Sequence, residues 1–390
     1  MRTLPTIGFD AKRAAQNRTG LGNYSRFVIR AVSHAQAVNR LLLYVPNPHK
    51  TSALGDIAGE RGVKMRFPSH GIWRWLRSLW RVWGVTSELV ADGVGLYHGL
   101  SNELPWNIRK AKNVRSIVTI HDLIFLRYPH YYKPVSRWIY HQKFRRACKQ
   151  ADHIIAVSEC TKRDIMHFFG TPENKISVIY QGCDERFRMP TTPNQREAVR
   201  VRYQLPPRFI LYVGSIEERK NLMLLAKALP QLQDTNITVI AIGRNTSYVN
   251  EVHHWIKSQG LSSRFRMLNN ISSADLPIFY QLASVFVYPS RFEGFGIPML
   301  EALCSGVPAI GCTGSCLEEA GGPSSCYVNP DDAQELANTI DRILADGELR
   351  TKMVNDGYVY AKRFETDALC KQLLNLYEEV VNTDICHGII

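Results

Sequence analysis

Short apolar runs alternate with loops and helix-like patterns along the chain, and they set its predicted architecture. Runs rich in β-branched and aromatic residues predict buried strands, which lie at 6–10, 41–45, 94–98, 114–120, 152–157, 209–214, 237–242, 265–268 and 285–288. Apolar positions spaced three and four apart follow several of these runs and predict helices, the last of them over 367–381. Strands that alternate with helices indicate an α/β protein with parallel sheets.

A stretch of different character separates two series of strands. Residues 181–207 are rich in charge and hold four prolines, which is typical of a linker between domains. We therefore expect a first domain over 1–187, a linker over 188–206 and a second domain over 207–366. The remaining residues, 367–390, form a C-terminal helical segment.

The most informative pattern lies at 285–310, where a buried strand leads through a glycine-containing loop into a helix. Gly294 and Gly296 allow the backbone to turn and to approach a ligand closely, and Pro298 suits the first helical position. A later glycine and proline end the helix. The helix N-terminus is thus expected at the C-terminal edge of a parallel sheet, where open α/β sheets bind phosphorylated ligands.

Two carboxylates flank this loop, Glu293 before the glycines and Glu301 in the helix. Each offers two acceptor oxygens, which suits the vicinal hydroxyls of a ribose or hexose. The spacing alone, however, favours a solvated loop residue and an ordinary helix residue. The loop after the strand 209–214 carries Arg219 and Lys220 at a helix entrance. Such a pair suits a diphosphate, although adjacent cations are also common on surfaces.

Two segments of the first half occupy comparable positions. Gly20, Leu21 and Gly22 lie between the first strand and an apolar helical pattern, which suits a phosphate or an acceptor but equally a plain loop. His121 and Asp122 directly follow the strand 114–120. A single histidine at a strand end is more often structural than functional, so the residues alone favour no catalytic role.

Composition narrows the class of protein. A hydrophobic fraction of 45% and a charged fraction of 21% are those of an ordinary soluble protein, and 390 residues suffice for two domains. The nine cysteines include no C-x-x-C pair, which indicates reduced thiols rather than disulfides or a zinc site. Neither a signal peptide nor an apolar stretch long enough to span a membrane is evident, so we expect a cytoplasmic protein.

The net charge of +13 is concentrated in the first half of the chain. Residues 1–190 hold 30 Lys and Arg against 13 Asp and Glu, whereas the remainder holds 18 against 22. This asymmetry predicts an anionic partner for the first half, which is a phospholipid surface, a pyrophosphate-linked acceptor or nucleic acid. No nucleic-acid-binding motif is present, so we favour the first two and expect no nucleic acid.

Two segments of this half are both aromatic and basic. Residues 72–85 hold four of the seven tryptophans and place three arginines on one helical face. This pattern is typical either of a helix in a membrane interface or of a helix docked on the core, and the wide apolar arc favours the core. Residues 128–149 border an acceptor channel or form a solvated helix face, and the solvated face is the simpler interpretation.

The motifs described above resemble those of a known enzyme family. Residues 292–308, FEGFGIPMLEALCSGVP, resemble the donor-binding signature of retaining glycosyltransferases of family 4, and 213–221, VGSIEERKN, resemble the diphosphate-binding loop of that family. The resemblance implies the GT-B fold, in which two Rossmann-like domains face each other across an interdomain cleft. It also implies that the C-terminal segment 367–390 packs back on the first domain.

The resemblance assigns roles to particular residues. The catalytic group comprises Arg219, Lys220, Glu293 and His121. The donor-binding group comprises Gly214, Gly243, Gly294, Phe295, Gly296, Ile297 and Glu301. The loop facing the acceptor or the donor sugar comprises Gly20, Leu21 and Gly22, with Asp122 nearby. No metal site is expected, and Asp331 and Asp332 are interpreted as the cap of a helix.

The implied function is the retaining transfer of a hexose from a nucleotide diphospho-sugar to a saccharide or a lipid-linked acceptor, without a cofactor. The sequences TIHDLI at 119–124 and SIEERKN at 215–221 look most like mannosyltransferases of bacterial surface-polysaccharide or O-antigen assembly. GDP-mannose is therefore the first expectation for the donor, and a UDP-sugar is the second. Contact of the basic first half with an anionic membrane is a further expectation. A nucleotide-sugar epimerase, a glycogen-synthase-like enzyme and a non-catalytic sugar-nucleotide binding module are the alternatives.

Overall fold

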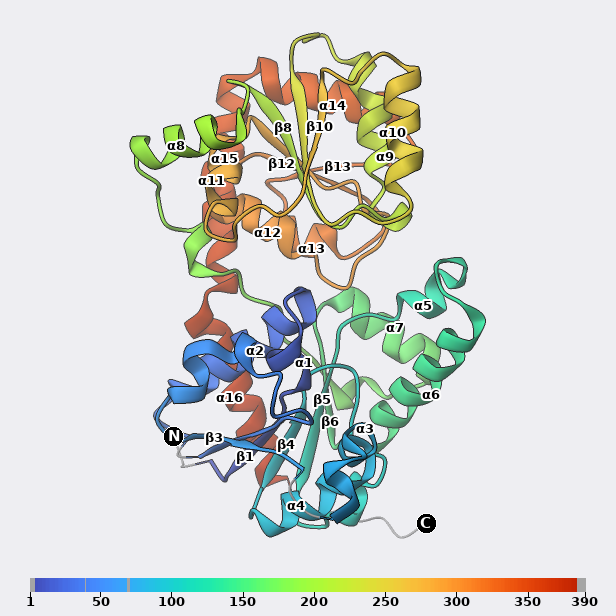
Figure 1. Cartoon of the computed structure of the whole chain (residues 1–390), viewed down its shortest axis with the longest axis vertical. Coiled ribbons are helices and arrows are strands. Elements are labelled where there is room, and N and C mark those ends of the chain that lie inside the picture. Colours follow the sequence, from blue (N-terminus) through green and yellow to red (C-terminus); the bar gives the residue numbers. More distant parts are fainter. Residues whose placement is uncertain (1–3, 39, 69–70, 384–390) are drawn as a thin grey trace. The chain divides into compact units, whose positions relative to one another are not determined.

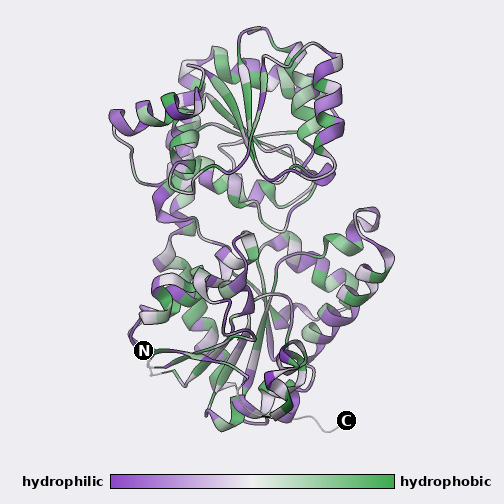
Figure 2. Ribbon diagram, in the orientation of Figure 1, coloured by the Kyte–Doolittle hydropathy of each residue, from purple (hydrophilic) through white to green (hydrophobic). Residues whose placement is uncertain are grey.

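The computed structural model describes residues 4–38, 40–68 and 71–383 (Figure 1). The chain forms two compact units. Unit 1 comprises the chain up to Gly182 together with the segment from Thr366 onward, and unit 2 comprises Cys183–Glu365. Figure 2 shows hydrophobic residues gathered in the strands of both units.

Unit 1 is built on a seven-stranded parallel sheet of order β3-β2-β1-β4-β5-β6-β7. Its strands are β1 (Ile7–Asp10), β2 (Leu41–Tyr44), β3 (Val63–Arg66), β4 (Leu96–Gly99), β5 (Arg115–Ile120), β6 (His153–Ala156) and β7 (Ile176–Val178). The chain winds outward in one direction from β1 to β3 and in the other from β4 to β7. The winding therefore reverses between β1 and β4, and ligands of open α/β sheets bind at such a reversal.

Helices cover the sheet of unit 1. They are α1 (Lys12–Gln16), α2 (Gly20–Ser33), α3 (Arg77–Leu79), the π-helical turn η3 (Trp80–Gly84), α4 (Val85–Ala91), α5 (Ile124–Arg127), α6 (Pro134–Gln150), α7 (Glu159–Phe169) and α16 (Thr366–Asn382). Helix α16 belongs to unit 1 although it lies at the far end of the chain. It packs on α2, its Tyr377 is fully buried, and the Sγ of Cys370 lies 3.1 Å from the carbonyl oxygen of Ala31.

Unit 2 has a six-stranded parallel sheet of order β10-β9-β8-β11-β12-β13. Its strands are β8 (Phe209–Val213), β9 (Thr238–Ile242), β10 (Phe265–Leu268), β11 (Val285–Val287), β12 (Ala309–Cys312) and β13 (Cys326–Val328). Its helices are α8 (Pro193–Tyr203), α9 (Leu222–Ala228), α10 (Val249–Ser258), α11 (Leu276–Leu282), α12 (Ile297–Cys304), α13 (Leu317–Gly321), α14 (Ala333–Ala345) and α15 (Gly347–Ala361). The winding reverses between β8 and β11. The predicted α/β class with two parallel sheets is confirmed.

The predicted linker over 188–206 is wrong. Most of it forms helix α8, which begins with a capping box between Thr192 and Gln195 and has Pro193 in its first turn. The Oγ1 of Thr191 donates to Oε1 of Gln281 in α11 at 2.7 Å, so the segment belongs to unit 2. Pro193 was interpreted as a linker residue, but proline is equally suited to the start of a helix.

Other corrections concern short elements. The sequence did not predict β3 and β7, which are the two edge strands of unit 1 and are only partly buried. None of the helices among the described residues is both long and apolar enough to cross a bilayer.

Residues 72–85 do not form the single helix that was expected, because a 3-10 turn at Gly71–Arg74 is separated from the contiguous elements α3, η3 and α4, which begin at Arg77. Trp80 is fully buried and its Nε1 donates to Oε1 of Glu88 at 2.6 Å, as expected for a residue docked on the core. Trp75, by contrast, is 86% exposed. The segment is therefore divided between the core and the surface.

Candidate functional site

The main candidate site lies in unit 2, where the winding of the sheet reverses. The loop after β8 carries Arg219 and Lys220, and the loop after β11 carries Glu293 and leads into α12. The backbone N–H of Arg291 donates to the carbonyl oxygen of Arg219 at 2.9 Å, so a direct hydrogen bond joins the two loops.

Glu293 is the centre of this site, and four groups converge on its Oε1. The Nη1 of Arg219 lies 2.9 Å away and the Nζ of Lys220 lies 3.8 Å away. The hydroxyls of Tyr288 and Ser290 donate to the same oxygen at 2.8 and 2.9 Å. Arg219 also donates to the carbonyl oxygen of Phe292, which holds the guanidinium against the loop.

Glu293 is held in its ionised form. Burial by itself would raise the pKa of Glu293, but the cations of Arg219 and Lys220 and the hydroxyls of Tyr288 and Ser290 lower it to about 2. Two cations therefore face one buried carboxylate, while the more exposed Glu217 also approaches Arg219, at 3.8 Å. Such an arrangement attracts an anion whose oxygens can replace water around the cations.

Glycines let the backbones of this region approach closely. A Cβ on Gly243 would lie 1.8 Å from the carbonyl oxygen of Gly214, so the end of β9 packs directly on the end of β8. Gly296 has φ of +107°, and a Cβ there would lie 2.7 Å from the side chain of Leu317. Gly296 is the N-cap of α12 and has no side chain to cover the N–H groups of the first turn, which are therefore suited to an anion.

Other predicted donor-site residues play different parts. The side chain of Phe295 is buried, and its ring centroid lies 5.5 Å from that of Phe364, so this residue offers a ligand only its backbone. Ile297 is the first residue of α12 and is half-buried. Gly294 lies in the loop immediately before them.

Glu301 lies in α12 and accepts a hydrogen bond at Oε2 from the hydroxyl of Tyr280 at 2.9 Å. Burial raises the pKa of Glu301 to about 7, while the Tyr280 hydrogen bond and the cations of Arg186 and Lys220 act in the opposite direction. This carboxyl group therefore titrates near neutral pH. Perturbed carboxyl groups of this kind are frequent at ligand sites.

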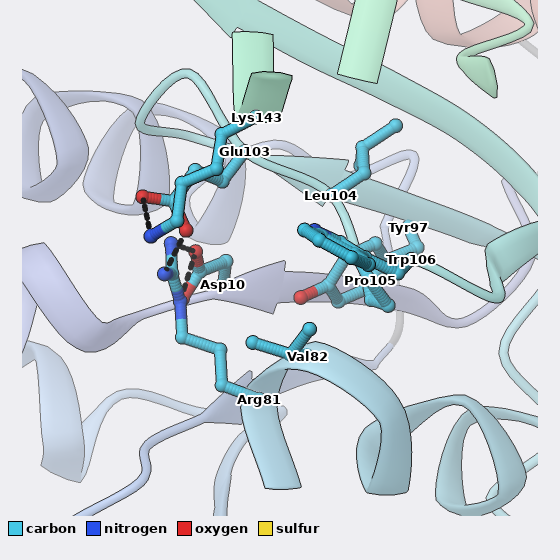
Figure 3. Close-up of a pocket in the computed structure, with 9 residues that line it drawn as sticks. All are labelled: Asp10, Arg81, Val82, Tyr97, Glu103, Leu104, Pro105, Trp106 and Lys143. Atoms are coloured by element: carbon cyan, nitrogen blue, oxygen red, sulfur yellow. Dashed lines mark hydrogen bonds and ion pairs between the residues drawn. The ribbon is translucent and has the colours of Figure 1, made fainter. Parts of the chain in front are cut away.

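A second charged cluster lies in unit 1, again where the winding of its sheet reverses. Asp10 ends β1, Glu103 follows β4, and Arg81 forms ion pairs with both, as Figure 3 shows. The Nε of Arg81 lies 2.9 Å from Oδ2 of Asp10, and its Nη1 lies 2.5 Å from Oε2 of Glu103. Lys143 of α6 approaches the other oxygen of Glu103 at 3.5 Å.

The two carboxylates of this cluster, Asp10 and Glu103, are compensated by the two cations, Arg81 and Lys143. Burial opposes the charge on Arg81, but Asp10 and Glu103 raise the pKa of this guanidinium above its usual value. Burial would raise the pKa of Glu103, whereas Arg81 and Lys143 lower it. The cavity beside these groups measures about 10 Å³, which is room for roughly one water.

His121 lies directly after β5 and is nearly buried. Its Nε2 is 2.9 Å from the carbonyl oxygen of Leu100, which can only accept, so this nitrogen carries the proton. Its Nδ1 is 3.4 Å from the amide nitrogen of Gln181. Burial lowers the pKa of His121 to about 4, so the ring is neutral at pH 7.

A chain of buried polar groups lies beside His121, and sequence reasoning missed it. The Nδ1 of His98 pairs with the hydroxyl of Tyr377 at 2.6 Å, and its Nε2 pairs with Oγ1 of Thr119 at 2.8 Å. Thr119 in turn meets the hydroxyl of Tyr24 at 3.0 Å, and the Tyr24 ring packs edge-on against His121. Because these residues come from four separate elements, no local pattern could have revealed their contact.

The predicted glycine loop of unit 1 is the first turn of α2, which begins at Gly20. A Cβ on Gly22 would lie 1.8 Å from the carbonyl oxygen of Asn17, whereas one on Gly20 would meet nothing within 4 Å. Gly22 is thus required for packing, and Leu21 is half-buried. Asp122 accepts a hydrogen bond from the backbone N–H of Ile124 at 3.1 Å at the start of α5, which is a structural role.

The acidic pair near α14 has structural partners. Asp332 is the N-cap of α14 and accepts from the backbone N–H of Glu335, as predicted, while Asp331 pairs with Arg291 at 2.6 Å. Among residues 4–38, 40–68 and 71–383, no three His, Cys, Asp or Glu side chains gather as a metal site would require.

Comparison with known families covers both units. The family model described as Glycosyltransferase Family 4 matches residues 27–187, and the model described as Glycosyl transferases group 1 matches residues 195–360. The chain is a family-4 glycosyltransferase. Among its relatives, this glycosyltransferase is 27% identical to O-antigen chain mannosyltransferase B of Escherichia coli over 381 residues, which span 92% of this chain and 96% of the relative. It is 26% identical to O-antigen chain mannosyltransferase RfbU of Salmonella typhimurium over 67% of this chain and 69% of that relative.

Solved structures place the glycosyltransferase in the GT-B fold. A glycosyltransferase from Rickettsia africae superposes with a TM-score of 0.77 at 18% identity, covering 97% of this chain and 99% of the other. The Anabaena protein Alr3699/HepE, solved with UDP and glucose, superposes with a TM-score of 0.76 at 19% identity and covers 96% of this chain and 100% of its own. These structures confirm the predicted fold, and the two family models confirm the predicted family.

Proposed function

We propose that this glycosyltransferase moves a hexosyl group, with retention of the anomeric configuration, from a nucleotide diphospho-sugar bound by unit 2. The observation that carries the proposal is the cluster of Arg219, Lys220 and Glu293 beside the N-terminus of α12. Two fixed cations and a helix N-terminus form a cradle for a diphosphate. Glu293 holds both cations in place and offers carboxylate oxygen to the sugar.

The chemistry follows from where charge develops. When the bond between the sugar and the diphosphate breaks, negative charge grows on the departing phosphate oxygens. Arg219 presents a planar fork and Lys220 a point charge to these oxygens, and both are already oriented by Glu293. The retaining course proposed here is attack by the acceptor on the face that the diphosphate leaves, with the departing phosphate taking the proton.

The donor sugar is proposed to be mannose, carried on GDP. Support comes from the two relatives named as O-antigen chain mannosyltransferases, one of which aligns over nearly its whole length. A UDP-sugar is the second candidate, because the structural neighbour HepE was solved with UDP and glucose. Glu301 is proposed to hold the ribose hydroxyls through its carboxyl group.

The acceptor is proposed to be a saccharide, free or carried on a lipid, as in O-antigen assembly. We assign its binding to unit 1, at the edge of the sheet where the winding reverses between β1 and β4. His121 is a positioning residue in this proposal, because its ring is neutral and both nitrogens already have partners.

The donor is tested by thermal shift with GDP-mannose, UDP-glucose and ADP-glucose. A ligand that binds only the folded protein raises Tm, so the true donor should give the largest increase. The reaction is then followed with that donor and a mannose-containing oligosaccharide, and the anomeric configuration of the product is read by NMR. The absence of a Tm increase with all three donors, or an inverted product, would contradict the proposal.

A further inference from the structure

Helix α6 of unit 1 presents an unusual exposed face. Its exposed side chains include Val135, Trp138, Ile139, Arg145, Arg146 and Lys149, here called the α6 surface. Their spacing of three and four residues places them on one stripe of the helix. Val135 is 71% exposed and Trp138 is 65% exposed, so the first half of the stripe is apolar and the second half is basic.

The opposite face of α6 accounts for how the helix is held. Phe144, Ala147 and Cys148 are buried in the core of unit 1, and the ring of Phe144 lies 5.2 Å from that of Phe125. The helix therefore already has a core-facing stripe, and Val135, Trp138 and Ile139 of the α6 surface lie outside that core. Exposed apolar side chains grouped in this way are typical of an interaction site.

The α6 surface continues onto neighbouring segments. A groove of about 580 Å³ runs between α6 and Trp106, and Trp138, Ile139, Arg145, Arg146 and Lys149 also line it. The guanidinium of Arg146 stacks on the Trp106 ring at 5.0 Å, and that ring meets Trp83 at 5.6 Å. Trp83 is 42% exposed, so the aromatic surface extends to the 71–84 segment, where Trp75 also faces solvent.

Charge indicates what this surface binds. Helix α6 contains no Asp or Glu, and unit 1 as a whole holds 29 Lys and Arg against 15 Asp and Glu, whereas unit 2 holds 19 against 20. The basic character therefore belongs to the unit that carries the exposed tryptophans. Tryptophan beside Lys and Arg is the combination that favours the interface of a membrane with anionic lipids.

We propose that the α6 surface docks unit 1 on an anionic phospholipid bilayer. Val135, Trp138 and Ile139 enter the boundary between headgroups and acyl chains, and Arg145, Arg146 and Lys149 contact the lipid phosphates. The surface is independent of the donor site in unit 2, so docking and sugar transfer can fail separately. Lys143 and Trp106 line both the groove and the Asp10–Arg81–Glu103 cluster, which brings a membrane-bound acceptor close to that cluster.

The test is co-sedimentation of the full chain with vesicles of phosphatidylcholine alone and of phosphatidylcholine mixed with phosphatidylglycerol. We expect binding to the mixed vesicles only, weakened by salt. Changing Arg145 and Lys149 to Gln should lower the partition coefficient about fivefold for each cation, which corresponds to about 1 kcal/mol each. Trp138→Ser should lower it about tenfold, the effect of about 55 Å² of apolar area.

Matched controls separate this surface from general charge and from folding. Arg61→Gln with Lys64→Gln removes two exposed cations at the opposite edge of the sheet, near β3, and should leave vesicle binding within about twofold. Sugar transfer to a water-soluble acceptor should be unchanged in all these variants, which also shows that they fold.

Three results would overturn the proposal. They are equal binding to neutral and anionic vesicles, no binding to either, and equal losses in the surface and control variants. Binding of single-stranded DNA that depends on Arg145 but not on Trp138, without vesicle binding, would assign the surface to nucleic acid instead.

Discussion

Replacing Glu293 by glutamine preserves the size of the side chain and removes its charge from the centre of the unit 2 site. The pKa of Glu293 is lowered from 4.5 to about 2. Since one pKa unit corresponds to about 1.4 kcal/mol, ionisation of Glu293 stabilises the folded protein by on the order of 3 kcal/mol. Because the folded-state pKa is depressed, this stability is present above about pH 4.5 and is lost as the pH falls through about 2. Glu293→Gln should therefore be destabilised at pH 7 and little affected near pH 2.

The same variant separates binding from turnover. Arg219 and Lys220 keep their charge but lose the carboxylate that orients them, so affinity for a nucleoside diphosphate should persist or increase. Turnover should fall by about 100-fold or more, which is the usual cost of losing an oriented group at developing charge. Affinity is measured by calorimetric titration with GDP and UDP, and turnover by initial rates of transfer. Stability is measured by denaturant unfolding at pH 7 and near pH 2.

Glu217→Gln is the matched control. Glu217 also approaches Arg219, at 3.8 Å, but its side chain is 37% exposed, so water screens the pair. The control should change stability by less than about 1 kcal/mol and should leave kcat within severalfold. Wild-type kcat and stability in Glu293→Gln, or equal losses of activity in both variants, would contradict the role assigned to Glu293.

Further predictions concern packing, the unit 1 cluster and Glu301. Gly22→Ala should lower the free energy of unfolding by about 3 kcal/mol or more, because of the overlap with Asn17, whereas Gly20→Ala should be neutral or stabilising by about 0.5–1 kcal/mol; urea unfolding compares them. Arg81→Met should lower the free energy of unfolding by about 3–5 kcal/mol, as measured by Tm and urea unfolding, because it leaves the buried Asp10 carboxylate without its cation and Glu103 with Lys143 alone. The pKa of Glu301 is raised from 4.5 to about 7, so its ionisation costs stability as the pH rises through that range, and Glu301→Gln should raise Tm at pH 8 but not at pH 4. Equal Tm changes at both pH values would contradict the last prediction.

Local patterns predicted much of unit 2. The strand, glycine loop and helix over 285–304 were predicted nearly to the residue, because hydrophobicity, glycine and proline all act within a few positions. The contact of Arg219 with Glu293 joins residues 74 positions apart, and only the family resemblance linked them. Local sequence patterns predicted each of the two loops. The loops lie together because their strands, β8 and β11, are neighbours in the sheet.

Unit 1 was predicted less well for a physical reason. Its candidate site depends on pairs such as Asp10 with Arg81 and His98 with Tyr377, which lie 71 and 279 positions apart. The periodicity of hydrophobic residues along the chain cannot reveal contacts between residues so far apart in sequence. The sequence placed Arg81 on a polar helical face with other arginines, whereas it is the most buried cation of the charged cluster. Pro193 was assigned to a linker, but it lies in the first turn of α8. The sequence around it fits a linker or a helix start equally well, and α8 is distinguished from a linker by its packing against α11.

The proposed stabilisation of the departing diphosphate by Arg219 and Lys220 can be measured as a rate. Acceptor-dependent release of nucleoside diphosphate is compared in the native protein, in Arg219→Gln with Lys220→Gln, and in Lys227→Gln, which removes an exposed cation on α9. We expect the double variant to keep its fold but to lose at least about 1,000-fold in kcat, and Lys227→Gln to be unaffected. A double variant that folds and turns over at the native rate would contradict the proposed stabilisation.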